Sequence, residues 1–243
     1  MVLKRRLWVL LTAAIMLVTV LVCSGVALAI TFGTDDGTKH PNVGALVDGS
    51  IAYCSGTLIS PTVFLTAAHC GTDGERVMVT FDSTYTSSST TYEGTFHQDP
   101  DYSTGGGRQR DPHDIAVVVF DKPITGITPA DLPTLGQLDG LAKGTQFTAV
   151  GYGVSSGRGA DVNVRRYAVS TLSAITPNYL ELSQKGKKGQ GGTCYGDSGG
   201  PNFLGETNTI AAITITGDAM CKSRNTVLRL DTQAALDFLG KYV

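Results

Sequence analysis

Short apolar and β-branched runs, separated by clusters of Gly, Asp, Ser and Pro, occupy the chain from Ile30 almost to its end. Such runs, without a sustained helical period, are typical of β-strands. About six strands are expected in each half of the chain, at residues 43–47, 55–59, 63–65, 77–81, 91–96 and 115–120, and at 146–152, 165–172, 179–182, 201–204, 209–216 and 226–230. The pattern therefore predicts an all-β protein of two small barrels.

The composition changes between the two groups of strands. From residue 121 to 138 the strand pattern stops and three prolines appear, which indicates a surface connection. The expected organisation is a first barrel over about 30–120, a linker over 121–138, a second barrel over about 139–230 and a short helix over 231–243. Asp231 is the candidate N-cap of that helix.

The first 29 residues differ in kind from the rest. Three basic residues at 4–6 precede an apolar run over 7–22, and Ala27-Leu28-Ala29 is a small-x-small cleavage pattern. These features predict a signal peptide over 1–29 and a secreted, extracellular protein. The alternative is an uncleaved membrane anchor, for which the run is somewhat short. The net charge of −2 for the whole chain indicates no nucleic-acid partner.

Four cysteines remain after that cleavage, and they are Cys54, Cys70, Cys194 and Cys221. An even number in an oxidising compartment indicates disulfides. Four cysteines allow three pairings, of which the simplest joins the two cysteines within each half. Each such bridge would contribute about 3 kcal/mol in the chain-entropy model.

The stretch from residue 192 to 201, GTCYGDSGGP, carries the strongest chemical signal. Its glycines permit positive φ and close approach, so the amides of Gly196 and Ser198 can point into one small space as an oxyanion hole. A serine in a glycine-rich loop is, by itself, equally consistent with a simple turn. A nucleophilic serine also needs a base that titrates near neutral pH and a carboxylate to orient that base.

His69 and Asp114 are the candidates for those two roles. His69 follows an apolar run and precedes a framework cysteine, although a histidine in such a place is more often structural. Asp114 comes directly before the apolar run 115–120, where a buried carboxylate needs a partner such as an imidazole N–H.

Three motifs follow one another along the chain: TAAHC at 66–70, DIA at 114–116 and GDSGGP at 196–201. With them the chain resembles the chymotrypsin/trypsin-like serine protease family, in particular its secreted bacterial branch, over essentially the whole mature sequence. The resemblance implies two perpendicular six-stranded antiparallel β-barrels and a serine endopeptidase without a cofactor. It implies Ser198 as the nucleophile, His69 as its base and Asp114 as the orienting carboxylate.

The resemblance also implies roles for residues around this triad. It pairs Cys54 with Cys70 and Cys194 with Cys221, and it gives the hydroxyl of Thr214 a supporting contact with the triad aspartate.

A free Ile or Val amine begins the active form of the family and pairs with the aspartate before the nucleophile. Cleavage after Ala29 would expose Ile30. We therefore expect an ion pair between the Ile30 ammonium and the Asp197 carboxylate. Signal peptidase would free this amine directly, without a separate propeptide. The alternative is that Ile30 is only a loose terminus.

The primary specificity pocket is expected to have Gly192 at its base. A trypsin-like enzyme has aspartate there, so the resemblance does not support a preference for Lys or Arg. Thr216 and Thr226 take the places of two wall glycines, and their side chains would narrow the pocket and favour small aliphatic residues. If Gly217 forms the wall instead, the pocket admits a larger apolar residue.

Protein or peptide substrates and protein inhibitors are the implied partners, with a monomer as the expected state. His40, His97 and His113 show no metal-ligand spacing and are expected at the surface, so no metal site is predicted. Two other functions stay open. One is a catalytically silent binding protein with the same fold, and the other is an active protease anchored by an uncleaved N-terminal segment.

Overall fold

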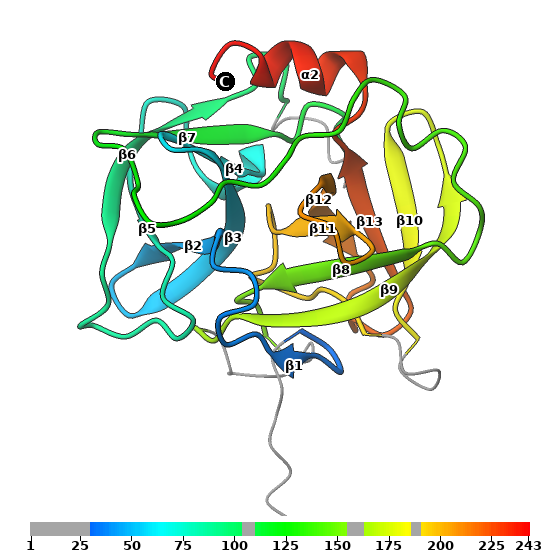
Figure 1. The fold of residues 1–243 in the computed structure, drawn as a ribbon, viewed down its shortest axis with the longest axis horizontal. Helices are drawn as coiled ribbons and strands as arrows, with labels where there is room; N and C mark the ends of the chain where they lie inside the picture. The colour runs from blue at the N-terminus through cyan, green and yellow to red at the C-terminus, as the bar shows by residue number, and fades with distance from the viewer. Residues whose placement is uncertain (1–29, 104–109, 155–162, 186–190) are drawn as a thin grey trace, which may run out of the picture.

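The computed structural model describes residues 30–103, 110–154, 163–185 and 191–243. The predicted signal peptide over 1–29 lies outside these residues. Two groups of strands lie side by side, one from each half of the chain (Figure 1). Among the described residues, no helix has both the length and the apolar character needed to cross a membrane.

Within the described residues, six antiparallel strands close the first barrel in the ring order β2-β3-β4-β7-β6-β5. They are β2 (Val43–Asp48), β3 (Ile51–Ser60), β4 (Val63–Thr66), β5 (Arg76–Thr80), β6 (Tyr92–Gln98) and β7 (Ala116–Phe120). Phe64, Phe81 and Phe120 lie buried in the core, and the Phe64 and Phe81 rings meet edge to face at 5.8 Å. Apolar side chains on the inward face of each strand fill such a small barrel.

The second barrel is also a ring of six antiparallel strands in the described part of the chain, in the order β8-β9-β10-β13-β12-β11, closed by pairing of β9 with β8. Its strands are β8 (Gln146–Gly151), β9 (Arg166–Ile175), β10 (Tyr179–Ser183), β11 (Pro201–Leu204), β12 (Ile210–Gly217) and β13 (Arg224–Arg229). A two-residue strand, β1 (Thr34–Asp35), adds to the outer side of β9. The predicted all-β class with two six-stranded barrels is confirmed.

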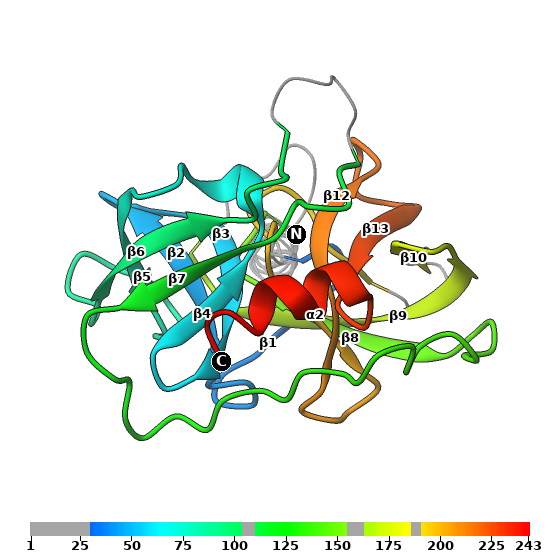
Figure 2. The same cartoon turned by 90° about the horizontal axis from the view of Figure 1, so that it is seen from above.

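A short helix, α2 (Gln233–Leu239), ends the chain and lies across the junction of the two groups of strands (Figures 1 and 2). Its N-cap is Thr232, whose side chain accepts a hydrogen bond from the amide of Ala235. The prediction of Asp231 as the cap is wrong. The Asp231 carboxylate is instead buried, where it accepts the Leu138 amide at 2.8 Å and pairs with Arg229.

One buried arginine joins the barrels. The guanidinium of Arg165, just before β9, donates to the carbonyl oxygens of Val43 and Phe81 in the first barrel, both at 2.9 Å. It also pairs with the Asp36 carboxylate at 2.8 Å. A buried guanidinium is tolerated only when its donors are satisfied, so these contacts hold the two barrels in one relative position.

Candidate active site

His69 and Asp114 meet at one end of the first barrel because their strands are neighbours. β4 and β7 are paired, with Thr66 opposite Ala116. His69 stands in the 3-10 turn η1 (Ala68–Cys70) just after β4, and Asp114 comes just before β7. The Asp114 carboxylate accepts the His69 backbone amide at 3.0 Å and its ring Nδ1 at 2.8 Å. Nδ1 therefore carries the proton, which leaves Nε2 as the basic nitrogen.

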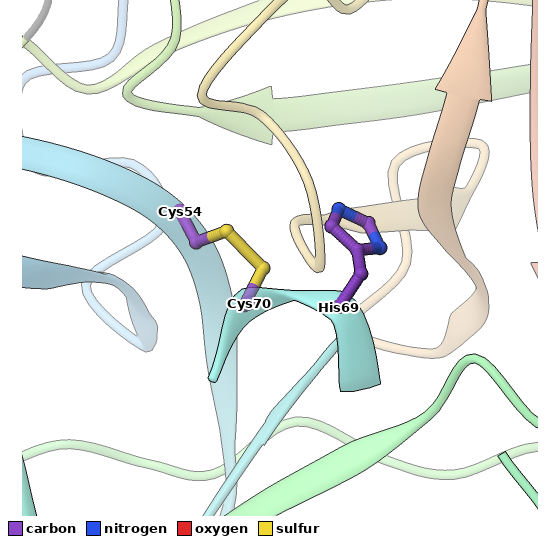
Figure 3. A group of neighbouring side chains, drawn as sticks. All are labelled: Cys54, His69 and Cys70. Atoms are coloured by element: carbon purple, nitrogen blue, oxygen red, sulfur yellow. A yellow bond between two sulfur atoms is a disulfide. The ribbon is translucent and has the colours of Figure 1, made fainter. Parts of the chain in front are cut away.

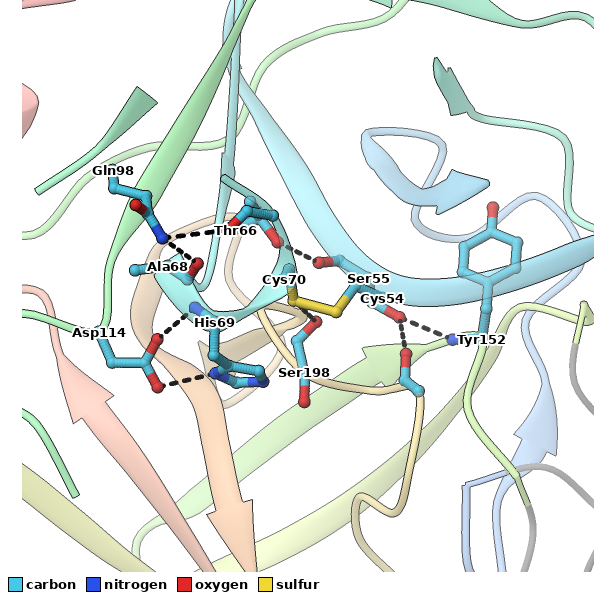
Figure 4. The surroundings of a disulfide bond; sticks show 12 residues. Cys54, Ser55, Thr66, Ala68, His69, Cys70, Gln98, Asp114, Tyr152 and Ser198 are labelled. Atoms are coloured by element: carbon cyan, nitrogen blue, oxygen red, sulfur yellow. Dashed lines mark hydrogen bonds and ion pairs between the residues drawn. A yellow bond between two sulfur atoms is a disulfide. The ribbon is translucent and has the colours of Figure 1, made fainter. Parts of the chain in front are cut away.

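Ser198 lies beside the imidazole edge that faces away from Asp114 (Figure 4). Its loop is held by one strand from each barrel. The amide of Ser55 in β3 donates to the Ser198 carbonyl at 2.8 Å, and the amide of Gly199 donates to the Thr214 carbonyl in β12 at 2.8 Å. Gly199 has a φ of +77°, and a Cβ there would stand 2.1 Å from Thr66 Oγ1, so the sequence needs glycine.

Two amides of this loop are turned toward the space next to Ser198. The carbonyl of Tyr195 accepts the amide of Val154 at 2.8 Å, which directs the amide of Gly196 the opposite way. Gly196 itself has a φ of +92°. In the described residues, neither the Gly196 nor the Ser198 amide donates to a protein acceptor. Two such free donors are what an oxyanion hole requires.

Asp197 anchors the loop from inside. Its side chain is completely buried and accepts the amides of Cys194 and Gly153, each at 2.8 Å. No cation pairs with it in the part of the chain that the structure describes. Burial raises the pKa of Asp197 to about 7, and the two backbone hydrogen bonds only partly offset that effect.

The start of the described chain enters the same region. The side chain of Ile30 is fully buried, and Thr31 forms an isolated bridge with Gly192. The amide of Gly192 donates to the Thr31 carbonyl at 3.1 Å.

Both predicted disulfides are present. Cys54 and Cys70 are joined next to His69 (Figure 3), and Cys194 is joined to Cys221. The cluster of Cys54, His69 and Cys70 has the proximity of metal ligands. Its two sulfur atoms are bonded to each other, so they are not thiolate ligands.

A cavity of about 490 Å³ opens beside Ser198. Thr193, Thr214, Thr216, Gly217 and the Cys194–Cys221 bridge are among the groups that line it. Its size is that of a site for one side chain or small ligand.

The described geometry matches known proteins over nearly its whole length. A family model described as Trypsin matches residues 32–235. The chain belongs to the trypsin family. As a member it is a serine-type endopeptidase that acts on proteins or peptides.

Individual relatives of this trypsin-family chain are more distant. Brachyurin from Leptuca pugilator is 29% identical over 203 residues, covering 71% of this chain and 80% of the relative. The structure of neuropsin, a serine protease expressed in mouse brain, superposes with a TM-score of 0.71 and 22% identity, covering 86% of this chain and 97% of neuropsin. HL collagenase superposes with a TM-score of 0.70 and 20% identity, covering 87% and 97%. The two structures establish the fold.

Gly192, which is predicted at the base of the specificity pocket, is not among the described residues that line the cavity of this trypsin-family chain. A Cβ on Gly192 would stand 1.9 Å from Oε1 of Gln184. Gln184 is fully buried, and its Nε2 contacts the Thr193 carbonyl at 3.4 Å. The side chain of Gln184 therefore fills the space beside Gly192, a contact that no sequence pattern indicated.

Of the two threonines predicted as walls, Thr216 lines the cavity but Thr226 does not. Thr226 is buried, and its hydroxyl donates to the Glu181 carboxylate at 3.0 Å. The reason is its place in β13, opposite Glu181 of β10. Gly217, the alternative considered, lines the cavity instead.

Two charged residues also line the cavity. Asp218 accepts backbone amides from Lys222, Ser223 and Arg224. Burial opposes its ionisation, but these hydrogen bonds outweigh that effect and lower its pKa to about 2. Arg224 lies beside the Glu181 carboxylate at 3.3 Å. The Asp218 oxygens are thus occupied by the loop itself.

Thr214 is buried, and the hydrogen-bond partner of its side chain is not the predicted Asp114. Its Oγ1 accepts the side-chain amide of Asn202 at 3.0 Å, and within the described residues it makes no hydrogen bond to Asp114. Because the hydroxyl is the acceptor in that bond, its own proton can still be donated elsewhere. The predicted support of Asp114 stays a prediction.

The three other histidines are predicted as surface residues, but each of them has an acidic partner. His40, His97 and His113 are each partly buried and lie beside Asp36, Asp73 and Asp99, respectively. Asp99, Asp101 and His113 place donor atoms within 4.8 Å of one another, and His113 Nδ1 and Asp99 already meet at 3.0 Å. Sequence spacing missed these contacts because loops bring the partners together.

Proposed function

We propose that this chain hydrolyses peptide bonds through an acyl-enzyme formed on Ser198. The observation that carries the proposal is the double hydrogen bond between His69 and Asp114 directly beside Ser198. Ser198 Oγ attacks the scissile carbonyl carbon while Nε2 of His69 takes its proton. The carbonyl oxygen becomes an oxyanion between the amides of Gly196 and Ser198.

The tetrahedral intermediate then collapses. The C–N bond breaks, His69 returns the proton to the leaving amine, and the acyl group stays on Ser198. Water repeats the sequence with His69 as base and releases the acid. Asp114 keeps the imidazole in the required tautomer and stabilises its charged form.

We propose that the side chain before the cut is small or apolar rather than Lys or Arg. Thr216 adds a side chain to the cavity wall, which supports a narrow pocket. A substrate ammonium or guanidinium would need a free carboxylate at the base. Asp218 is a poor partner for such a cation, because backbone amides already occupy its oxygens.

We also propose secretion, removal of residues 1–29 and activation through an Ile30 ammonium paired with Asp197. Disulfide-containing trypsin-family proteins are typically extracellular. The buried Ile30, the Thr31 bridge to Gly192 and the cation-free Asp197 all support a terminus inserted at this point. We further propose that the chain belongs to the secreted bacterial branch of the family; two of the relatives named above come from Leptuca pugilator and mouse. We also propose that the protein is a monomer and that protein inhibitors bind it.

Intact-mass measurement of the secreted protein with and without a fluorophosphonate tests these points together. We expect the untreated mass of Ile30–Val243 with two disulfides and the gain of one label on Ser198. Ser198→Ala is the matched control and takes no label. A correct mass without labelling of the wild type would favour a silent binding protein, and a retained N-terminal segment would favour a membrane anchor.

A further inference from the structure

Ser55 makes an unexpected set of contacts with the loop that carries Ser198. It lies in β3 of the first barrel and is completely buried. Its hydroxyl donates to the Gly196 carbonyl at 2.9 Å and accepts the amide of Tyr152 at 3.0 Å (Figure 4). Its backbone amide donates to the Ser198 carbonyl at 2.8 Å. One residue of the first barrel thus holds two carbonyls of the loop.

These contacts fix the peptide groups on either side of the two free amides. The Val154 amide holds the Tyr195 carbonyl, Ser55 Oγ holds the Gly196 carbonyl, and the Ser55 amide holds the Ser198 carbonyl. A peptide group is planar, so holding a carbonyl oxygen also sets the direction of the amide that follows it. Planarity thus sets the Gly196 amide through the Tyr195 carbonyl, and it sets the Ser198 amide through the Asp197 carbonyl, which accepts the Gly200 amide at 2.9 Å. The two Ser55 contacts hold the peptide group between those two and the one that follows them, so Ser55 limits the rotation of both.

The surroundings of Ser55 are closely packed. A Cβ on Gly151 would stand 3.0 Å from Ser55 Oγ, and one on Gly200 would stand 3.1 Å from Ser55 Cβ. Without the hydroxyl, the buried Tyr152 amide and the carbonyl of the partly buried Gly196 would both lose this partner. Such groups cost free energy, and the loop would shift to satisfy them.

We propose that Ser55 is a positioning residue for the oxyanion hole, with its hydroxyl keeping the Gly196 and Ser198 amides aligned for the transition state. Ser55 does not touch the substrate in this role. The proposal rests on the proposed function, because alignment of the hole affects rate only in an enzyme that uses it. It predicts a defect in kcat and not in substrate binding, since the oxyanion forms only after binding.

The test compares Ser55→Ala with Thr57→Val, using a peptide ester substrate and a peptide boronate as the transition-state analogue. Thr57 is a suitable control because it is also buried in β3 and its Oγ1 has no hydrogen-bond partner. For Ser55→Ala we expect kcat to fall about tenfold with KM nearly unchanged, less than the 10²–10³ that follows loss of a whole donor. Boronate affinity should weaken by a similar factor. Thr57→Val should change neither quantity.

An unchanged kcat in Ser55→Ala, or an equal loss in Thr57→Val, would overturn the role of Ser55. If Ser55→Ala does not accumulate as folded protein, Ser55→Gly removes the same hydroxyl and is expected to lower kcat at least threefold at constant KM. An unchanged kcat there also overturns the proposal. A wild-type protein that neither turns over the ester nor takes a fluorophosphonate would instead contradict the proposed function itself.

Discussion

Gln184 and Gly192 are in contact such that the side chain of one occupies the space that a side chain on the other would need. Gln184 is fully buried, and its Oε1 has no hydrogen-bond partner. Gln184 Nε2 also contacts the carbonyl of Thr193, which lines the cavity, so Gln184 lies directly behind the cavity wall.

Shortening Gln184 should open space behind Thr193 and so enlarge the cavity. For Gln184→Ala, we compare kcat/KM for a substrate with phenylalanine before the cut with kcat/KM for one with alanine there. We expect this ratio to rise about tenfold, because each methylene that a pocket accommodates changes kcat/KM by about 10- to 200-fold. The measurement is hydrolysis of two matched peptide substrates. An unchanged ratio in a variant with a normal fluorophosphonate reaction would show that Gln184 does not limit the size of the cavity.

Mutation of Thr216 and mutation of Thr226 should affect substrate preference differently. Thr216→Ala removes atoms from the cavity wall and should raise kcat/KM for larger apolar residues by about tenfold. Thr226→Ala removes a contact with Glu181 outside the cavity and should leave that preference unchanged. The same substrate pair measures both variants. Equal shifts in preference would mean that Thr226 also reaches the substrate.

Replacing Asp114 with asparagine should damage catalysis far more than binding. The amide cannot hold Nδ1 in its protonated form as the carboxylate does, so His69 would present the wrong tautomer to Ser198. We expect kcat to fall by about 10⁴ with a small change in KM. Steady-state kinetics checks this, with Asp99→Asn as a control because that carboxylate contacts His113 instead. A loss below tenfold would contradict the assigned role of Asp114.

Asp197 should make stability depend on pH while Ile30 remains in peptide linkage. Its pKa is raised from 3.8 to about 7 in the folded chain. The folded state therefore keeps a proton that the unfolded state has lost, so the stabilisation is complete below pH 3.8 and is lost as the pH rises through about 7. A free Ile30 ammonium would favour the charged carboxylate and remove this decline.

The comparison uses two chains in the inactive Ser198→Ala background, one beginning at Ile30 and one extended by two residues. We expect Tm of the extended chain to fall between pH 4.5 and pH 7.5, and Asp197→Asn to flatten that curve. The chain beginning at Ile30 should have the higher Tm at pH 7.5. Identical curves for both chains would exclude the ammonium–carboxylate pair.

The contact between His69 and Asp114 and the two disulfides could be predicted because the short motifs that contain these residues resemble those of a known family. His69 beside Cys70, and Asp114 before an apolar run, are local arrangements that barrel pairing then brings together. The strand pattern likewise predicted the two barrels, because a short β-branched run bounded by turn residues is a property of each segment alone.

The remaining features depend on packing between distant segments. Gln184 gave no signal because its contact with Gly192 arises from loop geometry. The side that Thr226 faces depends on its register with Glu181. Thr232, and not Asp231, caps the helix because the Asp231 carboxylate forms an ion pair with the buried Arg229. Ser55 looked like an ordinary strand serine, and its role is visible only once both barrels are in place.

Closure of both barrels also limits where one copy of this protease can cleave another. A protease cleft that binds an extended segment does so by pairing with its backbone. In the two described rings, each strand already has a neighbour on both sides, so its backbone groups are occupied and its chain cannot be drawn out without unfolding. Self-digestion is thereby directed to the connecting loops.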